Sequence, residues 1–328
     1  MNEILSLAGA NLLSPIILSF ALGVSAALAR SDLAIPEAVA KGMSIYLLFA
    51  IGFKGGVAVS THGVDTTLIL SLLAGLVLSF CLPLLAFALL RIMTGMNNTD
   101  AAAVAAHYGS ISIVTFVAGT SVLEGRMIDS EGYLVAVAAV MEAPAILSAL
   151  WLVARGGEDK GDKKMDPELL REILLNGSIV LLVGAFVIGV LTGEKGLAEI
   201  SSFIVNPFKG VLCLFLLDMG LIAGRGLRKI RGVISSGAIA FAILMPLINS
   251  VIGLGIGVMI GLSLGGVVLL MVLSASASYI AVPAAMRVAL PEANPAIYLT
   301  LSLGVTFPFN LTLGIPLYLA MAQLAMGV

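Results

Sequence analysis

Two short stretches place hydroxyl side chains, glycine and proline inside otherwise apolar segments. The first is Gly109-Ser110-Ile111-Ser112 with Thr115 close behind, and the second is Ser276-Ala277-Ser278-Tyr279 followed by Pro283. Glycine and interior proline weaken a helix, and hydroxyl groups can satisfy the backbone groups that are freed. A helix that restarts after such a break offers an N-terminus with about +0.5 charge and unpaired N–H groups, which suits an anion.

The two stretches together predict one anion site made from two broken helices. We expect the substrate-binding residues to be Gly109, Ser110, Ser112, Thr115, Ser276, Ser278, Tyr279 and Pro283. The alternative is that the serines are small packing residues that hydrogen-bond their own helix, which is common in membranes. The recurrence of the pattern in both halves of the chain favours the functional interpretation.

Two acidic residues lie deep inside apolar runs, namely Glu142 and Asp218. A charge at the centre of a bilayer costs on the order of 3 kcal/mol on insertion scales, so such residues are candidates for function. We expect them to hold Na⁺ or a proton, and Glu142 is the preferred Na⁺ ligand because Pro144 leaves carbonyl groups unpaired nearby. Thr306 and Asn310, in the matching stretch of the other half, complete the predicted cation-coupling set. The alternative is a protonated acid that donates to a neighbouring carbonyl.

The composition indicates a membrane protein. Hydrophobic residues make up 60% of the 328 residues and charged residues 11%, and the mean hydropathy is +1.13. Soluble domains are about 25% charged. The net charge of −2 argues against a nucleic-acid partner. We find no nucleotide-binding loop, metal-ligand cluster or nucleophile elbow, so we expect neither an enzyme nor a cofactor beyond Na⁺.

Ten apolar stretches are long enough to span a hydrocarbon core of about 30 Å. They fall roughly at 12–29, 36–53, 66–90, 100–122, 132–154, 173–191, 207–223, 233–260, 264–286 and 295–326. The fourth and ninth contain the polar stretches described above. The sequence therefore predicts an all-α integral membrane protein with ten transmembrane helices, of which helices 4 and 9 are broken near the midplane.

The chain also contains an internal duplication. Residues 41–56 recur as residues 209–224, with Lys, Gly, Leu, Gly and Gly coinciding at an offset of 168 residues. An odd number of crossings per copy forces the second copy into the opposite orientation, which is the inverted-repeat plan of secondary transporters. We expect residues 1–154 to form the first five-helix repeat, 155–168 a polar cytoplasmic linker, and 169–328 the second, inverted repeat.

Lysine and arginine predict the orientation. The connections after odd-numbered segments hold 13 of these residues, and the other side holds 4. By the positive-inside rule the richer side is cytoplasmic, so both termini face outward and the 155–168 linker faces the cytoplasm.

The chain resembles the sodium-dependent bicarbonate transporters first known from cyanobacteria. The similarity covers nearly the whole length, and its most specific parts are Ile35-Pro36-Glu37-Ala38, Ile51-Gly52-Phe53-Lys54-Gly55-Gly56, Glu142-Ala143-Pro144-Ala145, Ser263-Leu264-Gly265-Gly266-Val267-Val268 and Glu292-Ala293-Asn294-Pro295-Ala296-Ile297-Tyr298.

The resemblance implies Na⁺-coupled bicarbonate uptake by a 5+5 inverted repeat with core and gate parts in a bacterial inner membrane. It also implies a homotrimer and, in some members, a PII-like cytoplasmic regulator. Glu142 stands where the family has an Asp. Where those transporters have Ser-Asp-Ile-Ser-Gly-Pro-Pro, this chain has Ser278-Tyr279-Ile280-Ala281-Val282-Pro283-Ala284, and Ile113 and Val114 replace Gly and Ser. The site is thus more apolar than in the family.

Three functions are compatible with these patterns. The first is a Na⁺-coupled importer of a small anion, with bicarbonate as the leading substrate. The second is a Na⁺- or proton-coupled transporter of a larger carboxylate, since Tyr279, Val282 and Phe307 could line an apolar wall. The third is a membrane sensor or scaffold that keeps the fold without turnover. The paired breaks and the two buried acids favour transport.

Overall fold

The described part of the chain is helical and contains no strand. The computed structural model describes residues 13–63, 65–156, 171, 175, 177–229, 234–279, 282–283, 285–286 and 290–328. The first half contains α2 (Pro15–Leu28), α3 (Glu37–His62), α4 (Thr66–Met93), α5 (Asn98–His107), α6 (Ile113–Glu124), α7 (Leu134–Val140) and α8 (Ala143–Gly156). The second half contains α10 (Gly177–Ile204), α11 (Phe208–Lys229), α12 (Ser236–Ile260), α13 (Leu264–Ala275), α15 (Pro295–Leu299), the π-helical turn η1 (Thr300–Thr306), α16 (Phe307–Phe309), the π-helical turn η2 (Asn310–Gly314) and α17 (Ile315–Met326).

Six helical stretches of the described chain are long and apolar enough to cross a membrane. They are Glu37–Thr61, Thr66–Met93, Leu134–Val153, Val180–Ile204, Ser236–Ile260 and Pro295–Met326. Each matches one of the ten expected segments, although α3 ends at His62 and α10 at Ile204, more than two turns beyond the expected ends. Shorter apolar helices occupy Pro15–Leu28, Ile113–Glu124 and Leu264–Ala275. The fourth expected segment is divided between α5 and α6, as its glycine and serines predict.

The expected linker at 155–168 lies, apart from its first two residues, outside the described residues. The first twelve residues lie outside them as well. Helix α15 begins with Asn294 as its N-cap and Pro295 at the first helical position, and the Asn294 side chain accepts a hydrogen bond from the Ala296 amide at 3.0 Å. An N-cap followed by proline at the first helical position is a favoured way to begin a helix.

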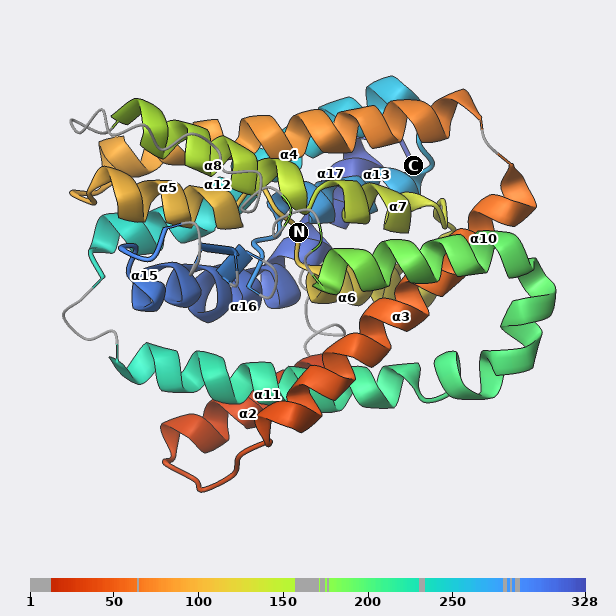
Figure 1. The fold of residues 1–328 in the computed structure, drawn as a ribbon, viewed down its shortest axis with the longest axis horizontal. Helices are drawn as coiled ribbons and strands as arrows, with labels where there is room; N and C mark the ends of the chain where they lie inside the picture. Colours follow the sequence, from red (N-terminus) through yellow and green to blue (C-terminus); the bar gives the residue numbers. More distant parts are fainter. Residues whose placement is uncertain are drawn as a thin grey trace.

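The helices form two groups (Figure 1). One group contains α2, α3, α10 and α11, which lie along the lower and right sides of the view, and α3 packs on α10 while α2 packs on α11. The other group contains α4–α8, α12, α13 and α15–α17, with α4 against α5, α7 and α8, and α13 against α6 and α12. We call these the panel group and the core group. Both broken segments belong to the core group.

The panel group is held by two glycine crossings of the same kind. Helices α2 and α11 cross at Gly23 and Gly220, and helices α10 and α3 cross at Gly189 and Gly56. At all four positions a Cβ would collide with a backbone carbonyl of the opposite helix. Gly56 thus packs against α10 as Gly220 packs against α2. The offset of 168 residues pairs Gly56 with Gly224, which lies one helical turn after Gly220. The close approach that glycine allows therefore occurs twice, and each crossing joins a helix of the first half to a helix of the second.

Prolines kink one long helix in each half of the core group, at Pro83 in α4 and Pro246 in α12. A proline has no N–H, so the carbonyl four residues earlier loses its helical partner. In α12 that carbonyl belongs to Ala242, and the Thr306 hydroxyl donates to it at 2.6 Å. The kinked helix is thereby bonded to the π-helical turn η1.

Connections of the two halves also brace each other. The Glu131 carboxylate, just before α7, accepts hydrogen bonds from the amide and the hydroxyl of Ser263 at the start of α13, at 2.7 and 2.9 Å. The Asp100 carboxylate, at the start of α5, accepts one from the Asn294 amide before α15, at 2.7 Å. Each brace joins two loops that the charge pattern assigns to one side of the membrane.

Candidate functional site

The first break lies between α5 and α6. Helix α5 ends at His107 and helix α6 begins at Ile113, with extended backbone at Ser112. The Ser112 hydroxyl oxygen caps α6 by accepting from the Thr115 amide at 3.2 Å and from the Thr115 hydroxyl at 2.9 Å. Gly109 lies against Pro83 and leaves no space for a Cβ, so the break fits against the kink of α4. Sequence reasoning placed this break correctly.

The second break begins where α13 ends at Ala275. Ser276 has extended backbone, and Ser276, Ser278 and Tyr279 are all buried. Pro283 is helical and buried, but Ile280 and Ala281, which separate it from Tyr279, lie outside the described residues. The predicted interruption of the ninth segment is therefore present, and the described chain is helical again at Val282 and Pro283.

Hydrogen bonds join the two breaks directly. The Ser112 amide donates to the Ser276 hydroxyl oxygen at 2.9 Å, and the Ser278 amide donates to the His107 carbonyl at 2.8 Å. Residues more than 160 positions apart are thus hydrogen-bonded to each other in the centre of the core group. The predicted substrate-binding residues of the two halves are brought together by these bonds.

These bonds change which groups are free to meet an anion. The amides of Ser112, Thr115 and Ser278 already have acceptors inside the protein. Donors for an anion must therefore come from side-chain hydroxyls and from the first N–H groups of α6, which have no partner within their own helix. An anion at this break would therefore meet the capping residues more than the amides beside the serines.

Glu142 lies at a third break, between α7 and α8. Pro144 stands in the first turn of α8, and the Ser79 hydroxyl bridges the gap by donating to the Met141 carbonyl at 2.6 Å and accepting from the Ala145 amide at 3.1 Å. This interruption of the fifth segment follows from Pro144 but was not predicted as a break.

The Glu142 side chain points at the first break. Its Oε2 accepts a hydrogen bond from the Ser110 hydroxyl at 2.9 Å, and the residue is 5% exposed. One hydroxyl donor compensates little of the desolvation of a buried carboxylate. A cation or a proton at this carboxylate would remove that cost. The link from Ser110 to Glu142 also connects the anion candidates to the cation candidates.

The remaining cation candidates are less directly placed. Thr306 is bonded to Ala242 and shares a 2.7 Å hydrogen bond with the Tyr108 hydroxyl, while Asn310 donates to the Ala275 carbonyl at 2.9 Å and accepts from Tyr318 at 2.7 Å. Thr306 and Asn310 hold the flanks of the two breaks, and their polar groups are engaged. Asp218 is buried in α11 of the panel group, and no hydrogen bond joins it to the other candidates among the described residues.

Two polar residues of the site were missed by sequence reasoning. Tyr108 bonds Thr306, as described, and Asn249 of α12 donates through its amide nitrogen to the Tyr108 carbonyl at 3.2 Å. Asn249 is fully buried, and its amide oxygen has no hydrogen-bond partner in the described structure. The signal that could have found Asn249 is the one that found Glu142, a polar residue inside a long apolar run.

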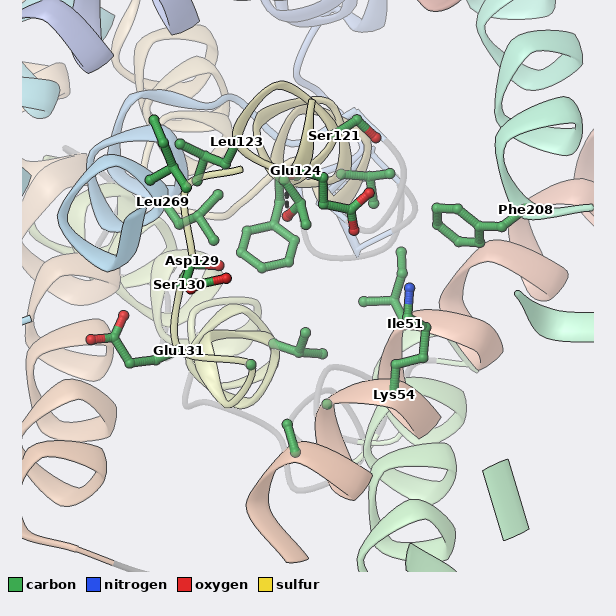
Figure 2. Close-up of a pocket in the computed structure, with 18 of the residues that line it drawn as sticks. Ile51, Lys54, Ser121, Leu123, Glu124, Asp129, Ser130, Glu131, Phe208 and Leu269 are labelled. Carbon is green, nitrogen blue, oxygen red and sulfur yellow. Dashed lines mark hydrogen bonds between the residues drawn. The ribbon is translucent and has the colours of Figure 1, made fainter. Parts of the chain in front are cut away.

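A cavity of about 800 Å³ separates the panel group from the core group. Figure 2 shows Lys54 and Phe208 on its panel side and Glu124 and Asp129 across from them. Its core wall includes Phe116, the residue after Thr115. The cavity therefore extends from the loops around residues 124–132 to the first turn of α6.

Charged side chains line the outer part of this cavity. Lys209 Nζ lies 3.4 Å from Glu124 Oε2, and these two side chains are 62% and 49% exposed. An ion pair this exposed contributes about 0–1 kcal/mol. Lys54 Nζ lies 5.4 Å from the centroid of the Phe208 ring, which is within cation–π range. The first contact joins α11 to α6 across the cavity, whereas the second joins α3 to α11 within its panel side.

Comparison with known proteins gives one family. A search of curated proteins found no match. The family model of the Na⁺-dependent bicarbonate transporter superfamily matches residues 15–323, which include both helix breaks, Glu142 and the whole cavity lining. The chain therefore belongs to the Na⁺-dependent bicarbonate transporter superfamily.

Proposed function

We propose that this multi-pass membrane protein is a symporter that imports a small anion, bicarbonate first, together with Na⁺. The observation that carries the proposal is the pair of helix breaks, hydrogen-bonded to each other and joined through Ser110 to the buried acid Glu142. An anion at a helix N-terminus and a cation at an adjacent carboxylate stabilise each other electrostatically in a low dielectric. That mutual dependence is the physical basis of coupled transport.

The arrangement of helices supports an inverted 5+5 repeat of ten spans as the framework of this transport. The glycine crossings and the loop braces each occur twice and join the two halves, and the helix-interior prolines occur once in each half. A site at the interface of two inverted repeats is expected near the midplane. We further propose that both termini face outward across a bacterial inner membrane, because the outer side then carries the cavity mouth and the fewer lysines and arginines.

Assembly and control are part of the same proposal. The family suggests a homotrimer, and a PII-like protein could act at the cytoplasmic face through the 155–168 linker. Native mass spectrometry of the purified protein in detergent tests the trimer. A dominant monomer that transports would contradict it.

The test of function is uptake into proteoliposomes. Purified protein is reconstituted at pH 8.5 and supplied with labelled bicarbonate, with an inward Na⁺ gradient or with choline replacing Na⁺. We expect uptake above protein-free vesicles only with the Na⁺ gradient, and competition by excess unlabelled bicarbonate. Uptake driven equally by a proton gradient would make the coupling ion H⁺. Competition by a larger carboxylate at lower concentration than bicarbonate would favour the second substrate class, and no uptake of any anion would favour a sensor.

A further inference from the structure

A buried tyrosine hydroxyl lies unpaired at the point where the two breaks meet. Tyr279 is 7% exposed, and its hydroxyl has no hydrogen-bond partner in the described structure. The hydroxyl lies beside the Ser112 side chain, and the two groups are not joined by a hydrogen bond of normal geometry. A buried hydroxyl without a partner destabilises the folded state, so native proteins rarely keep one without a use.

The surroundings of this hydroxyl suit an acceptor with negative charge. Ser112 is the N-cap of α6, a helix of 12 residues, so the positive end of that helix lies beside the Tyr279 hydroxyl. The Ser112 oxygen already accepts two hydrogen bonds from Thr115, which leaves its own proton available as a donor. Two hydroxyl donors and a helix N-terminus favour an anion over a cation, because the partial positive charge of the helix end repels a cation.

The ring of Tyr279 restricts the size and shape of what can bind there. It packs edge-on against Phe307 with ring centroids 5.0 Å apart, and Phe307 packs in turn against Phe20 of α2 at 5.3 Å. Tyr279 is therefore fixed between the core group and the panel group. All the serines and the threonine of the breaks are at most 3% exposed, so a ligand that reaches the hydroxyl would be enclosed by protein.

We propose that the Tyr279 hydroxyl is a substrate hydrogen-bond donor that makes the site selective for small planar oxyanions, such as bicarbonate and formate. The trigonal oxygens of such an anion accept from Tyr279 and Ser112 together, while its flat face lies against the aromatic ring. This inference rests on the proposed function, since it names the residue that recognises the anion at the same site.

The test compares Tyr279→Phe with the parent, using Tyr46→Phe as the matched control. The control substitution also removes a hydroxyl, but the Tyr46 hydroxyl donates to the Phe203 carbonyl and so joins two panel helices, α3 and α10, away from the breaks. Ligand-induced shifts of the unfolding temperature are measured with sodium bicarbonate, sodium formate and sodium sulfate at constant Na⁺. Uptake of labelled bicarbonate gives the half-saturation constant.

In Tyr279→Phe we expect the half-saturation constants for bicarbonate and formate to rise about tenfold or more, the loss typical of a hydrogen bond to a charged group. Its unfolding temperature without anion should be equal to or above that of the parent, because an unsatisfied buried hydroxyl is removed. The parent and Tyr46→Phe should respond alike, and sulfate should stabilise none of them.

Unchanged anion constants in Tyr279→Phe would overturn the inference while leaving the transporter intact. A lower unfolding temperature without anion, with unchanged constants, would make the hydroxyl purely structural. A parent that sulfate stabilises as well as bicarbonate would overturn the planar selectivity. A parent that responds to no anion would instead contradict the proposed function.

Discussion

At the scale of single residues, the site couples one acid to two hydroxyl-rich breaks. Glu142 is the acid that the breaks approach, and Ser110 is the hydroxyl between them. Asp218, the other acid expected to hold Na⁺ or a proton, lies in the panel group and has different neighbours. Both acids are buried, as their apolar sequence neighbours predict. They differ in their spatial neighbours, because these depend on which helices pack together.

Glu142→Gln tests the cation role at this scale. Glutamine keeps the size and can still accept from Ser110, but it cannot neutralise Na⁺. A ligand stabilises the native state in proportion to the logarithm of its concentration above Kd. We therefore expect the rise in unfolding temperature from choline chloride to sodium chloride to disappear, with at least a tenfold higher Na⁺ half-saturation constant for uptake.

The matched control for Glu142→Gln is Glu124→Gln, which removes an exposed acid at the cavity mouth. This control should keep the parental Na⁺ response. A parental Na⁺ response in Glu142→Gln itself would remove Glu142 from the Na⁺ site. A response to pH in place of Na⁺ in the parent would indicate proton coupling.

At the scale of elements, glycine makes possible two crossings between a helix of the first half and a helix of the second. In α11, Gly220 lies against the backbone of α2, whereas Gly210 on the same helix has open space around it. Helix propensity alone would favour alanine over glycine at both positions by up to about 1 kcal/mol. Packing decides the outcome at Gly220, because a Cβ there would meet a backbone carbonyl that cannot move aside.

Gly220→Ala and Gly210→Ala form a matched pair that tests this crossing. Overpacking of this kind costs about 1–3 kcal/mol. We expect Gly220→Ala to lower the unfolding temperature of the detergent-solubilised protein, and Gly210→Ala to leave it unchanged or raise it slightly. Fluorescence-detected size exclusion after a heat step measures both. Equal stability of the two variants would show that α2 and α11 do not cross at Gly220.

At the scale of the whole molecule, two helix groups enclose a cavity of about 800 Å³ that reaches the first turn of α6. The cavity mouth is bounded by the loop at residues 124–132 and by the connection between α10 and α11. By the charge pattern, both face outward. A route from the outside to the breaks thus fits the proposed direction of transport.

Cysteine labelling tests the orientation of the whole molecule. In a variant lacking Cys81 and Cys213, single cysteines replace Met127, which is 92% exposed in the outer loop, or Gly161 in the linker. We expect an impermeant maleimide to label Met127→Cys in intact cells and Gly161→Cys only after lysis. Labelling of Gly161→Cys in intact cells would reverse the proposed orientation.

Many of the spans and helix breaks can be predicted from the sequence because they depend on local composition. Apolar length identified the spans, and glycine, serine and proline identified the break between α5 and α6 and the end of α13. An acid within an apolar run identified Glu142. Gly220 lies in the duplicated segment, but the duplication by itself did not predict its crossing with α2, since glycine allows a close approach without specifying which helix makes it.

Only the tertiary structure decided which of these groups meet. The bonds from Ser112 to Ser276 and from Ser278 to His107 join residues distant in the chain, and nothing local specifies them. The same holds for Thr306 on the kinked α12, for the unpaired hydroxyl of Tyr279 beside Ser112, and for the separation of Asp218 from Glu142. Local patterns fix where a helix must break or stay buried, because those preferences act over one or two turns. The partner that satisfies each freed group is set by how whole helices pack, which depends on every contact at once.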